Sequence, residues 1–161
     1  MKLTYKVKKM NYRTFYLLFL LFASSSCDRS IEAKLAKRGE DCGAKGCEIN
    51  LTDITDFEWD KVYIYNHPTT LENVSDTLGI RYENFVEHRR PIIFLYKNKI
   101  VHAENHMLWS DEIDDGQVVF DEYNYYLHVY TSNNAKFILR KERYSSDVSF
   151  YLLVNTSRIT K

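Results

Sequence analysis

The stretch that decides the fold of this 161-residue chain is Arg90-Pro91-Ile92-Ile93-Phe94-Leu95-Tyr96-Lys97-Asn98-Lys99-Ile100-Val101-His102-Ala103. Two apolar runs, 92–96 and 100–103, flank a polar turn, and this pattern predicts a β-hairpin. The first run is apolar at every position rather than at alternate ones. We therefore expect it to form a strand that is covered on both faces, as at the centre of a sheet.

Strand-like segments continue on both sides of the hairpin. The 13 tyrosines and 9 phenylalanines fall mostly in alternating runs after position 57, a pattern that favours strands. Upstream, the stretch 48–65 predicts one or two strands. Downstream, further strands are predicted at 117–121, 125–131, 135–143 and 148–155. The sequence thus indicates a single α+β domain, mainly antiparallel β-sheet with one or two helices packed on it.

One helix is predicted just before the hairpin. Thr69 and Glu72 have the spacing of a capping box, with Thr69 as the N-cap. Leu71 and Val74 recur at helical spacing, and Gly79 is suited to end the helix. We expect this helix to lay its apolar face on the sheet.

The first 26 residues have the order of a secretory signal. Five basic residues and no acidic one precede an apolar run at 15–23, which is followed by three serines. The run is too short to cross a bilayer, because a spanning helix requires about 20 residues. We therefore expect segment 1–26 to be removed as a signal peptide.

The end of this segment resembles the signal of bacterial lipoproteins. In that family small residues, here Ser25 and Ser26, precede a cysteine that is acylated and becomes the first mature residue, here Cys27. The resemblance implies a lipid anchor at Cys27 that holds the protein on a membrane. The alternative is an ordinary secretory signal cleaved near Ser26, which would leave Cys27 free.

The same resemblance implies a location in the bacterial cell envelope, facing the periplasm. Asp28 follows the anchor, and in enteric-type bacteria an aspartate there resembles the signal that keeps lipoproteins in the inner membrane. Other bacterial groups read this position differently. The choice between inner and outer membrane therefore stays open.

Without its signal the chain is acidic. We expect residues 27–47 to form a tether and residues 48–161 to form the compact domain. Loss of the five basic signal residues leaves 17 basic against 22 acidic residues, a net charge of −5. Nucleic-acid binders concentrate Lys and Arg on one face, so nucleic acid is not expected as a partner.

Cys42 and Cys47 are expected to pair as a disulfide that closes a loop in the tether. The exported compartment is oxidising, and Gly43 and Gly46 permit the tight loop that such a bridge requires. A metal site is disfavoured because no second pair of cysteines or nearby histidine completes it. A free redox pair stays open, although redox motifs usually space their cysteines by two residues.

The segment Phe57-Glu58-Trp59-Asp60-Lys61-Val62-Tyr63 resembles a Phe-x-Trp-Asp-Lys-hydrophobic-Tyr motif of uncharacterised small bacterial lipoproteins. That family implies a small exported α+β domain and no particular activity. In an extended chain Phe57 and Trp59 point to one side, and the carboxylates between them point to the other. We expect Asp60 to hold a backbone amide or to pair across the sheet rather than to act in catalysis.

His102, Glu104 and His106 form a metal-capable set. Residues two apart share one face of a strand, and two imidazoles with a carboxylate can bind a transition metal. The competing interpretation is an ordinary solvated strand face without a metal. The sequence does not distinguish these two alternatives, and we assign no metal to these residues from it.

The usual enzyme signatures do not occur: the chain has no Gly-rich phosphate loop, no Gly-x-Ser-x-Gly and no His-Glu-x-x-His. The absence of these motifs favours a binding role over a catalytic one without excluding an enzyme. No cofactor is expected. We expect a lipid-anchored binding or interaction module for an unidentified envelope protein or ligand. The alternatives are an immunity protein or inhibitor of an envelope-acting enzyme or toxin, a metal-dependent site at His102, Glu104 and His106, and a purely structural envelope role.

Overall fold

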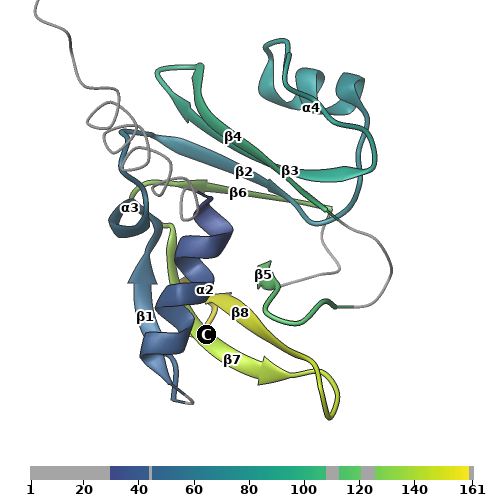
Figure 1. Ribbon diagram of the computed structural model, residues 1–161. Coiled ribbons are helices and arrows are strands. Elements are labelled where there is room, and N and C mark those ends of the chain that lie inside the picture. The colour runs from purple at the N-terminus through teal and green to yellow at the C-terminus, as the bar shows by residue number, and fades with distance from the viewer. Residues whose placement is uncertain (1–29, 44, 108–112, 121–125, 160–161) are drawn as a thin grey trace, which may run out of the picture.

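The computed structural model describes residues 30–43, 45–107, 113–120 and 126–159. The signal segment 1–26 and Cys27 lie outside these residues, so the predictions about them stay predictions. The described residues form two four-stranded sheets with helices packed on them (Figure 1). The predicted α+β fold with mainly antiparallel strands is confirmed.

One sheet contains the hairpin that the sequence indicated most clearly. Its strand order is β4 (Lys99–Met107), β3 (Arg89–Tyr96), β2 (Lys61–Tyr65) and β6 (Leu127–Thr131), and each neighbouring pair is antiparallel. Helix α4 (Leu71–Leu78) lies over the outer face of this sheet (Figure 1).

The other sheet combines one strand from early in the described chain with three strands that come after the β3–β4 hairpin. Its order is β1 (Cys47–Asn50), β7 (Lys136–Arg143), β8 (Ser149–Asn155) and β5 (Val118–Phe120). Strands β5 and β8 run parallel, whereas the other neighbours are antiparallel. The predicted strands at 117–121, 125–131, 135–143 and 148–155 therefore all occur with slightly shorter bounds, and residues 121 and 125 lie outside the described part.

Strand β3 divides the interior into two cores, as its continuous apolar run predicts. Ile92 and Phe94 face a core that lies between the two sheets and under helix α2 (Ile31–Cys42). Ile93 and Leu95 face a smaller core under α4. Because alternate residues of a strand point to opposite faces, a strand between two cores must be apolar at every position.

The β3–β4 turn explains the role of the aspartate in the Phe-x-Trp-Asp-Lys segment. Lys97 and Asn98 have positive φ angles of 50° and 59°, which is the backbone of a type I′ hairpin turn. The Lys97 N–H donates to Asp60 Oδ2 at 2.7 Å, so Asp60 fixes the turn. The prediction that Asp60 holds a backbone amide is confirmed.

The stretch 27–47 is not the tether that was expected, because most of it is helix α2 (Ile31–Cys42). Its stripe of Ile31 and Leu35 is narrow, yet both side chains are fully buried in the core between the sheets. Gly39 lets the helix approach β8, since a Cβ there would lie 2.3 Å from Tyr151 Cδ1. Tertiary packing thus fixes a helix whose own apolar pattern is weak.

Two shorter helices complete the fold, and α4 begins one residue later than predicted. Helices α3 (Leu51–Ile54) and α5 (Thr156–Ile159) are single turns. In α4 the N-cap is Thr70, whose hydroxyl accepts from the Asn73 N–H, and Gly79 ends the helix in the left-handed conformation. Val74 is buried, whereas Leu71 is 40% exposed, so the apolar face is narrower than predicted.

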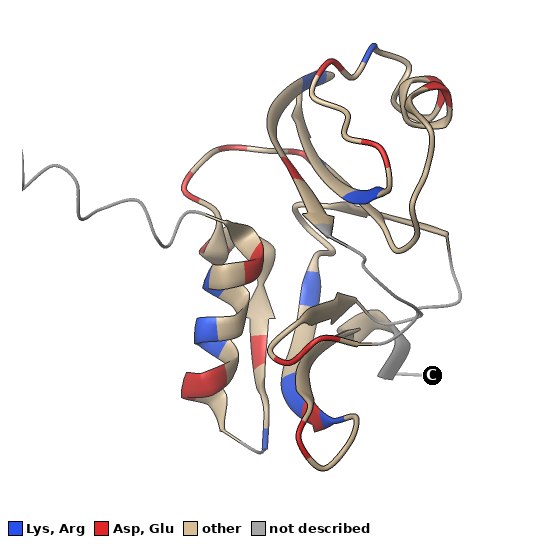
Figure 2. Ribbon diagram, turned by 45° about the vertical axis from the view of Figure 1, so that its right-hand side comes forward, with Lys and Arg blue, Asp and Glu red and all other residues tan. Residues whose placement is uncertain are grey.

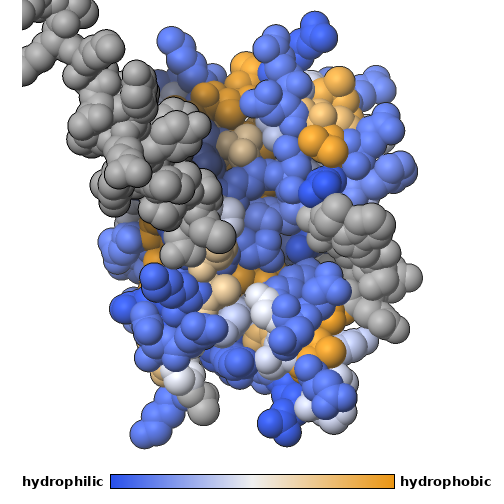
Figure 3. Space-filling view, viewed as in Figure 1, coloured by the Kyte–Doolittle hydropathy of each residue, from blue (hydrophilic) through white to orange (hydrophobic). Residues whose placement is uncertain are grey.

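The exposed large apolar side chains do not form one continuous face in the view of Figure 3, where hydrophobic residues gather in separate groups. Among the described residues they are Leu71, Val86, Val101, Tyr126, Val129 and Tyr144.

Candidate functional site

His102, Glu104 and His106 lie on one face of β4, as their spacing predicts, but this face is covered. The side chains of Glu104 and His106 are each 11% exposed, and that of His102 is 29% exposed. The first turn of α2 packs over them, because the Ile31 N–H donates to Glu104 Oε1 at 2.8 Å. The interpretation of a solvated strand face is therefore wrong.

Glu104 lies at the centre of this arrangement. Besides the Ile31 amide, Glu104 Oε1 faces His102 Nε2 at 2.7 Å. Glu104 Oε2 lies 3.2 Å from His106 Nε2, an ion-pair distance without the alignment of a hydrogen bond. A carboxylate that accepts the first amide of a helix also interacts favourably with the helix dipole.

Glu32 extends the cluster from α2 to a third element. Glu32 Oε2 contacts His106 Nδ1, and Glu32 Oε1 accepts from the Val118 N–H at 3.1 Å. Helix α2 is thereby joined to β4 and to β5. We call the four side chains of Glu32, His102, Glu104 and His106 the clamp.

The clamp holds Glu32, Glu104 and His106 in their charged forms at neutral pH. Burial alone would lower the pKa of His106, but the carboxylates of Glu104 and Glu32 outweigh it and raise that pKa to about 9. Burial would raise the pKa of Glu104, yet contacts with both histidines and the Ile31 amide lower it to about 2. The pKa of Glu32 is lowered as well, because His106 and the Val118 amide outweigh burial.

The clamp does not have the geometry of a metal centre. In the part of the chain that the structure describes, no three His, Cys, Asp or Glu side chains are arranged to hold a metal ion. The two ring nitrogens of His106 face two different carboxylates, and Glu104 Oε1 is occupied by an amide. The arrangement at His102, Glu104 and His106 is thus a set of mutual ion pairs that docks α2, which suits a structural role better than metal chemistry.

The aromatic residues of the Phe-x-Trp-Asp-Lys segment extend this cluster into the core. The Phe57 ring stacks on His102 with centroids 4.7 Å apart, and both Phe57 and Trp59 meet Phe94 edge to face at 5.3 Å. Trp59 Nε1 donates to Thr55 Oγ1 at 3.0 Å. The motif residues therefore pack and fix the domain, and none of them lines the pocket described next.

Cys42 and Cys47 are bonded as a disulfide, as predicted, with Cα atoms 5.4 Å apart. Gly43 and Gly46 both have positive φ, at 62° and 69°. At Gly46 a Cβ would also lie 2.8 Å from the Leu139 carbonyl oxygen. The bridge fastens the C-terminal end of α2 to the start of β1.

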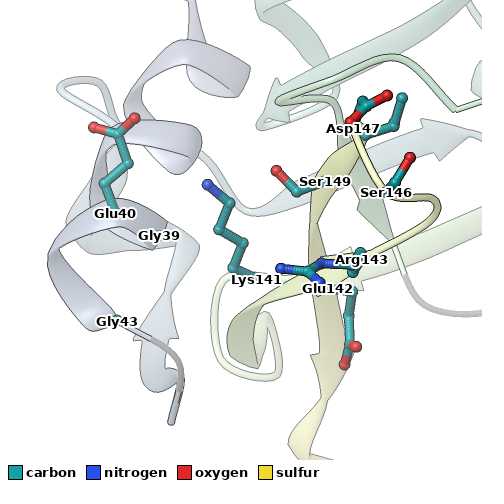
Figure 4. Close-up of a pocket in the computed structure, with 10 residues that line it drawn as sticks. Gly39, Glu40, Gly43, Lys141, Glu142, Arg143, Ser146, Asp147 and Ser149 are labelled. Atoms are coloured by element: carbon teal, nitrogen blue, oxygen red, sulfur yellow. The ribbon is translucent and has the colours of Figure 1, made fainter.

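A polar pocket of about 530 Å³ lies beside this end of α2. The residues that line it come from α2 and from the β7–β8 hairpin: Gly39, Glu40, Gly43, Lys141, Glu142, Arg143, Ser146, Asp147, Val148 and Ser149. We call it the hairpin pocket. Figure 4 shows Lys141 and Arg143 extending from β7 toward the space beside α2, while Glu142 turns away. Its volume falls in the range of small-molecule sites.

The pocket walls carry charges of both signs. Figure 2 shows basic and acidic residues interspersed over α2 and the hairpin rather than separated by sign. Glu142 is already paired, because its Oε1 lies 2.7 Å from Arg140 Nε. Arg143 has no carboxylate within ion-pair distance among the described residues. Local sequence patterns did not indicate this pocket, because its walls come from segments far apart in the chain.

Comparisons with protein-family models, with curated proteins and with solved structures each find no match. Among the described residues no helix is long and apolar enough to cross a membrane. The clamp and the hairpin pocket are therefore interpreted from their own chemistry.

Proposed function

We propose that this protein is a lipid-anchored binding module of the bacterial cell envelope and that the hairpin pocket is its binding site. Cys27 carries the anchor in this proposal, as the resemblance to lipoprotein signals implies. The fold supports it, because the α+β class is the one that the resemblance of the Phe-x-Trp-Asp-Lys segment also implies.

The observation that carries the proposal is the position of α2. Only residues 28–30 separate Cys27 from Ile31, the first residue of the helix. The four Cα–Cα steps from Cys27 to Ile31 span at most about 14 Å even when the chain is fully extended. An anchor at Cys27 would therefore hold the N-terminal end of α2 close to the membrane surface.

The hairpin pocket lies at the opposite end of the same helix. Helix α2 has 12 residues, which corresponds to a length of about 18 Å. The clamp docks its first turn on β4, and the disulfide holds its last turn beside β1. The domain would thus present the pocket away from the bilayer, where periplasmic ligands can reach it.

Cell fractionation tests the anchor. Wild-type protein is expected in the membrane fraction, and Cys27→Ala is expected to lose that association. Replacement of Cys42 and Cys47 together is the matched control, because it removes cysteines without removing the anchor. Equal membrane association of wild type and Cys27→Ala would refute the proposal.

The orientation is tested by fluorophores at two single sites on the lipidated protein in liposomes. Ala33→Cys marks the first turn of α2 and Ser146→Cys marks the hairpin pocket. Lipids that carry a quencher are expected to quench the first fluorophore much more strongly than the second. Equal quenching at both sites would contradict the proposed orientation.

An inhibitor or immunity role is the second candidate. The turn between β7 and β8 projects beyond the rest of the described fold in Figure 1, and Tyr144 beside it is 53% exposed. Exposed aromatic residues frequently dominate protein interfaces. Inhibition of a lysozyme-like enzyme or an envelope toxin that Tyr144→Ala abolishes and Tyr126→Ala retains would support this role, whereas full enzyme activity at excess protein would remove it.

A further inference from the structure

We propose that the hairpin pocket binds a zwitterionic ligand of the amino-acid or short-peptide class, with its ammonium group at the end of α2 and its carboxylate on β7. This inference rests on the proposed function and specifies the ligand of the same pocket. It follows from the charged side chains that line the pocket, with Glu40 on the α2 side and Lys141 and Arg143 on β7.

The α2 wall is suited to a cation. Glu40 lies in the last turn of α2, and that turn contains no basic residue to offset the negative end of the helix dipole. Glu40 also lies near Tyr151 of β8, and burial together with the charges of Glu40 and Asp115 raises the pKa of Tyr151. The pocket therefore has a carboxylate at the negative end of α2.

The β7 wall is suited to a carboxylate. Lys141 Nζ is held 5.6 Å above the ring of Tyr151, and Arg143 beside it has no carboxylate within ion-pair distance among the described residues. The planar guanidinium of arginine matches a carboxylate with two parallel hydrogen bonds. The guanidinium of Arg143 can therefore bind a carboxylate from the β7 side of the pocket.

The third wall, at the β7–β8 turn and the start of β8, supplies the hydroxyls of Ser146 and Ser149 beside the carboxylate of Asp147. Asp115 Oδ1 accepts from both the N–H of Ser149 at 2.9 Å and its hydroxyl at 3.1 Å. This fixes the hydroxyl and leaves its oxygen able to accept from the ligand. A ligand with a single sign of charge would be repelled by one wall, whereas a zwitterion complements both.

Calorimetric titration of the full-length protein in detergent micelles with alanyl-alanine tests the inference. Saturable binding is expected for the free dipeptide. N-acetyl-alanyl-alanine and alanyl-alanine amide, each lacking one charge, are expected to bind at least about tenfold more weakly, because each loses a charge-assisted contact. No saturable binding of the free dipeptide, or binding of either blocked peptide as tightly as the free dipeptide, would overturn the proposal.

Substitutions in the pocket test which residue binds the carboxylate of the dipeptide and which binds its ammonium group. Arg143→Ala is expected to weaken the free dipeptide about tenfold, with partial recovery in Arg143→Lys, and Glu40→Gln is expected to weaken it similarly. Lys136→Ala, an exposed cation on β7 outside the pocket, is the control. Unchanged affinity in Arg143→Ala and Glu40→Gln would place the ligand elsewhere. Because the titration does not depend on the lipid, a protein that binds the dipeptide but lacks an anchor would refute only the proposed membrane attachment.

Discussion

The carboxylate of Glu104 accepts a hydrogen bond from the backbone amide of Ile31 at 2.8 Å, across 73 positions of the chain. This contact docks the first turn of α2 on β4, and it places a negative charge at the positive end of the helix. His106 and Glu32 extend it to β5. The helix that would lead from the anchor is therefore attached to both sheets by buried polar contacts.

Glu104→Gln is expected to destabilise the protein by about 2–4 kcal/mol, because it removes one partner of a buried ion pair and leaves His106 with less compensation. The free energy of unfolding from urea titration measures this loss. Glu48→Gln, an exposed carboxylate on β1, is the control and should change stability little. An equal loss of unfolding free energy in both variants would show that Glu104 contributes no more to stability than an exposed carboxylate does.

The contribution of the clamp to the free energy of unfolding is expected to be highest between about pH 4.5 and pH 6.5. The pKa of His106 is raised from 6.5 to about 9 in the folded protein, so its contribution is complete below pH 6.5 and is lost as the pH rises through 9. The pKa of Glu104 is lowered from 4.5 to about 2, so its contribution is complete above pH 4.5 and is lost toward pH 2.

His106→Gln separates the two limbs of this profile. The variant should be less stable at pH 6 and should lose much of the alkaline decline, because the group that deprotonates is gone. His88→Asn is the control, since His88 is exposed and asparagine tolerates its positive φ of 60°. Urea midpoints between pH 5 and pH 9.5 provide the measurement, and an unchanged alkaline decline in His106→Gln would disprove the role of His106.

Gly39→Ala is expected to destabilise the protein by about 1–3 kcal/mol, the usual cost of overpacking. The added Cβ would lie 2.3 Å from Tyr151 Cδ1, and ring and helix would have to separate. The same substitution in a Tyr151→Leu background should cost less, because the ring is absent. Thermal unfolding of the four proteins gives the comparison, and an equal cost in both backgrounds would contradict the contact.

Asp60→Ala is expected to cost about 1–2 kcal/mol, since the Lys97 amide in the I′ turn loses its carboxylate acceptor. Asp53→Ala, an exposed aspartate in α3, serves as control. Amide hydrogen exchange should show faster exchange in the β3–β4 turn of Asp60→Ala alone. Unaltered exchange there would mean that another group holds the turn.

Local sequence patterns were sufficient for the β3–β4 hairpin and for α4, because their signals lie within one segment. A run that is apolar at every position indicates a strand between two cores, and β3 is such a strand. The role of Asp60 could also be predicted from the sequence, since a carboxylate beside a strand commonly accepts a hydrogen bond from a backbone amide.

Helix α2 and the two candidate sites could not be predicted from local sequence patterns in the same way. Ile31 and Leu35 are too few to indicate a buried helix, and the helix depends on Glu104, which is far away in the chain. The spacing of His102 and His106 correctly placed them on one face, but what covers that face depends on the tertiary fold. Glu32, the fourth member of the clamp, lies in a segment whose polar composition predicts a tether, so no local pattern indicates its role.

The proposed orientation of the domain depends on the anchor at Cys27, and mass spectrometry of the N-terminal peptide from membrane-extracted protein tests this anchor. We expect a mature chain that begins at Cys27 and carries a diacylglyceryl group on sulfur. A mature chain that begins at another residue, or that has an unmodified Cys27, would contradict it.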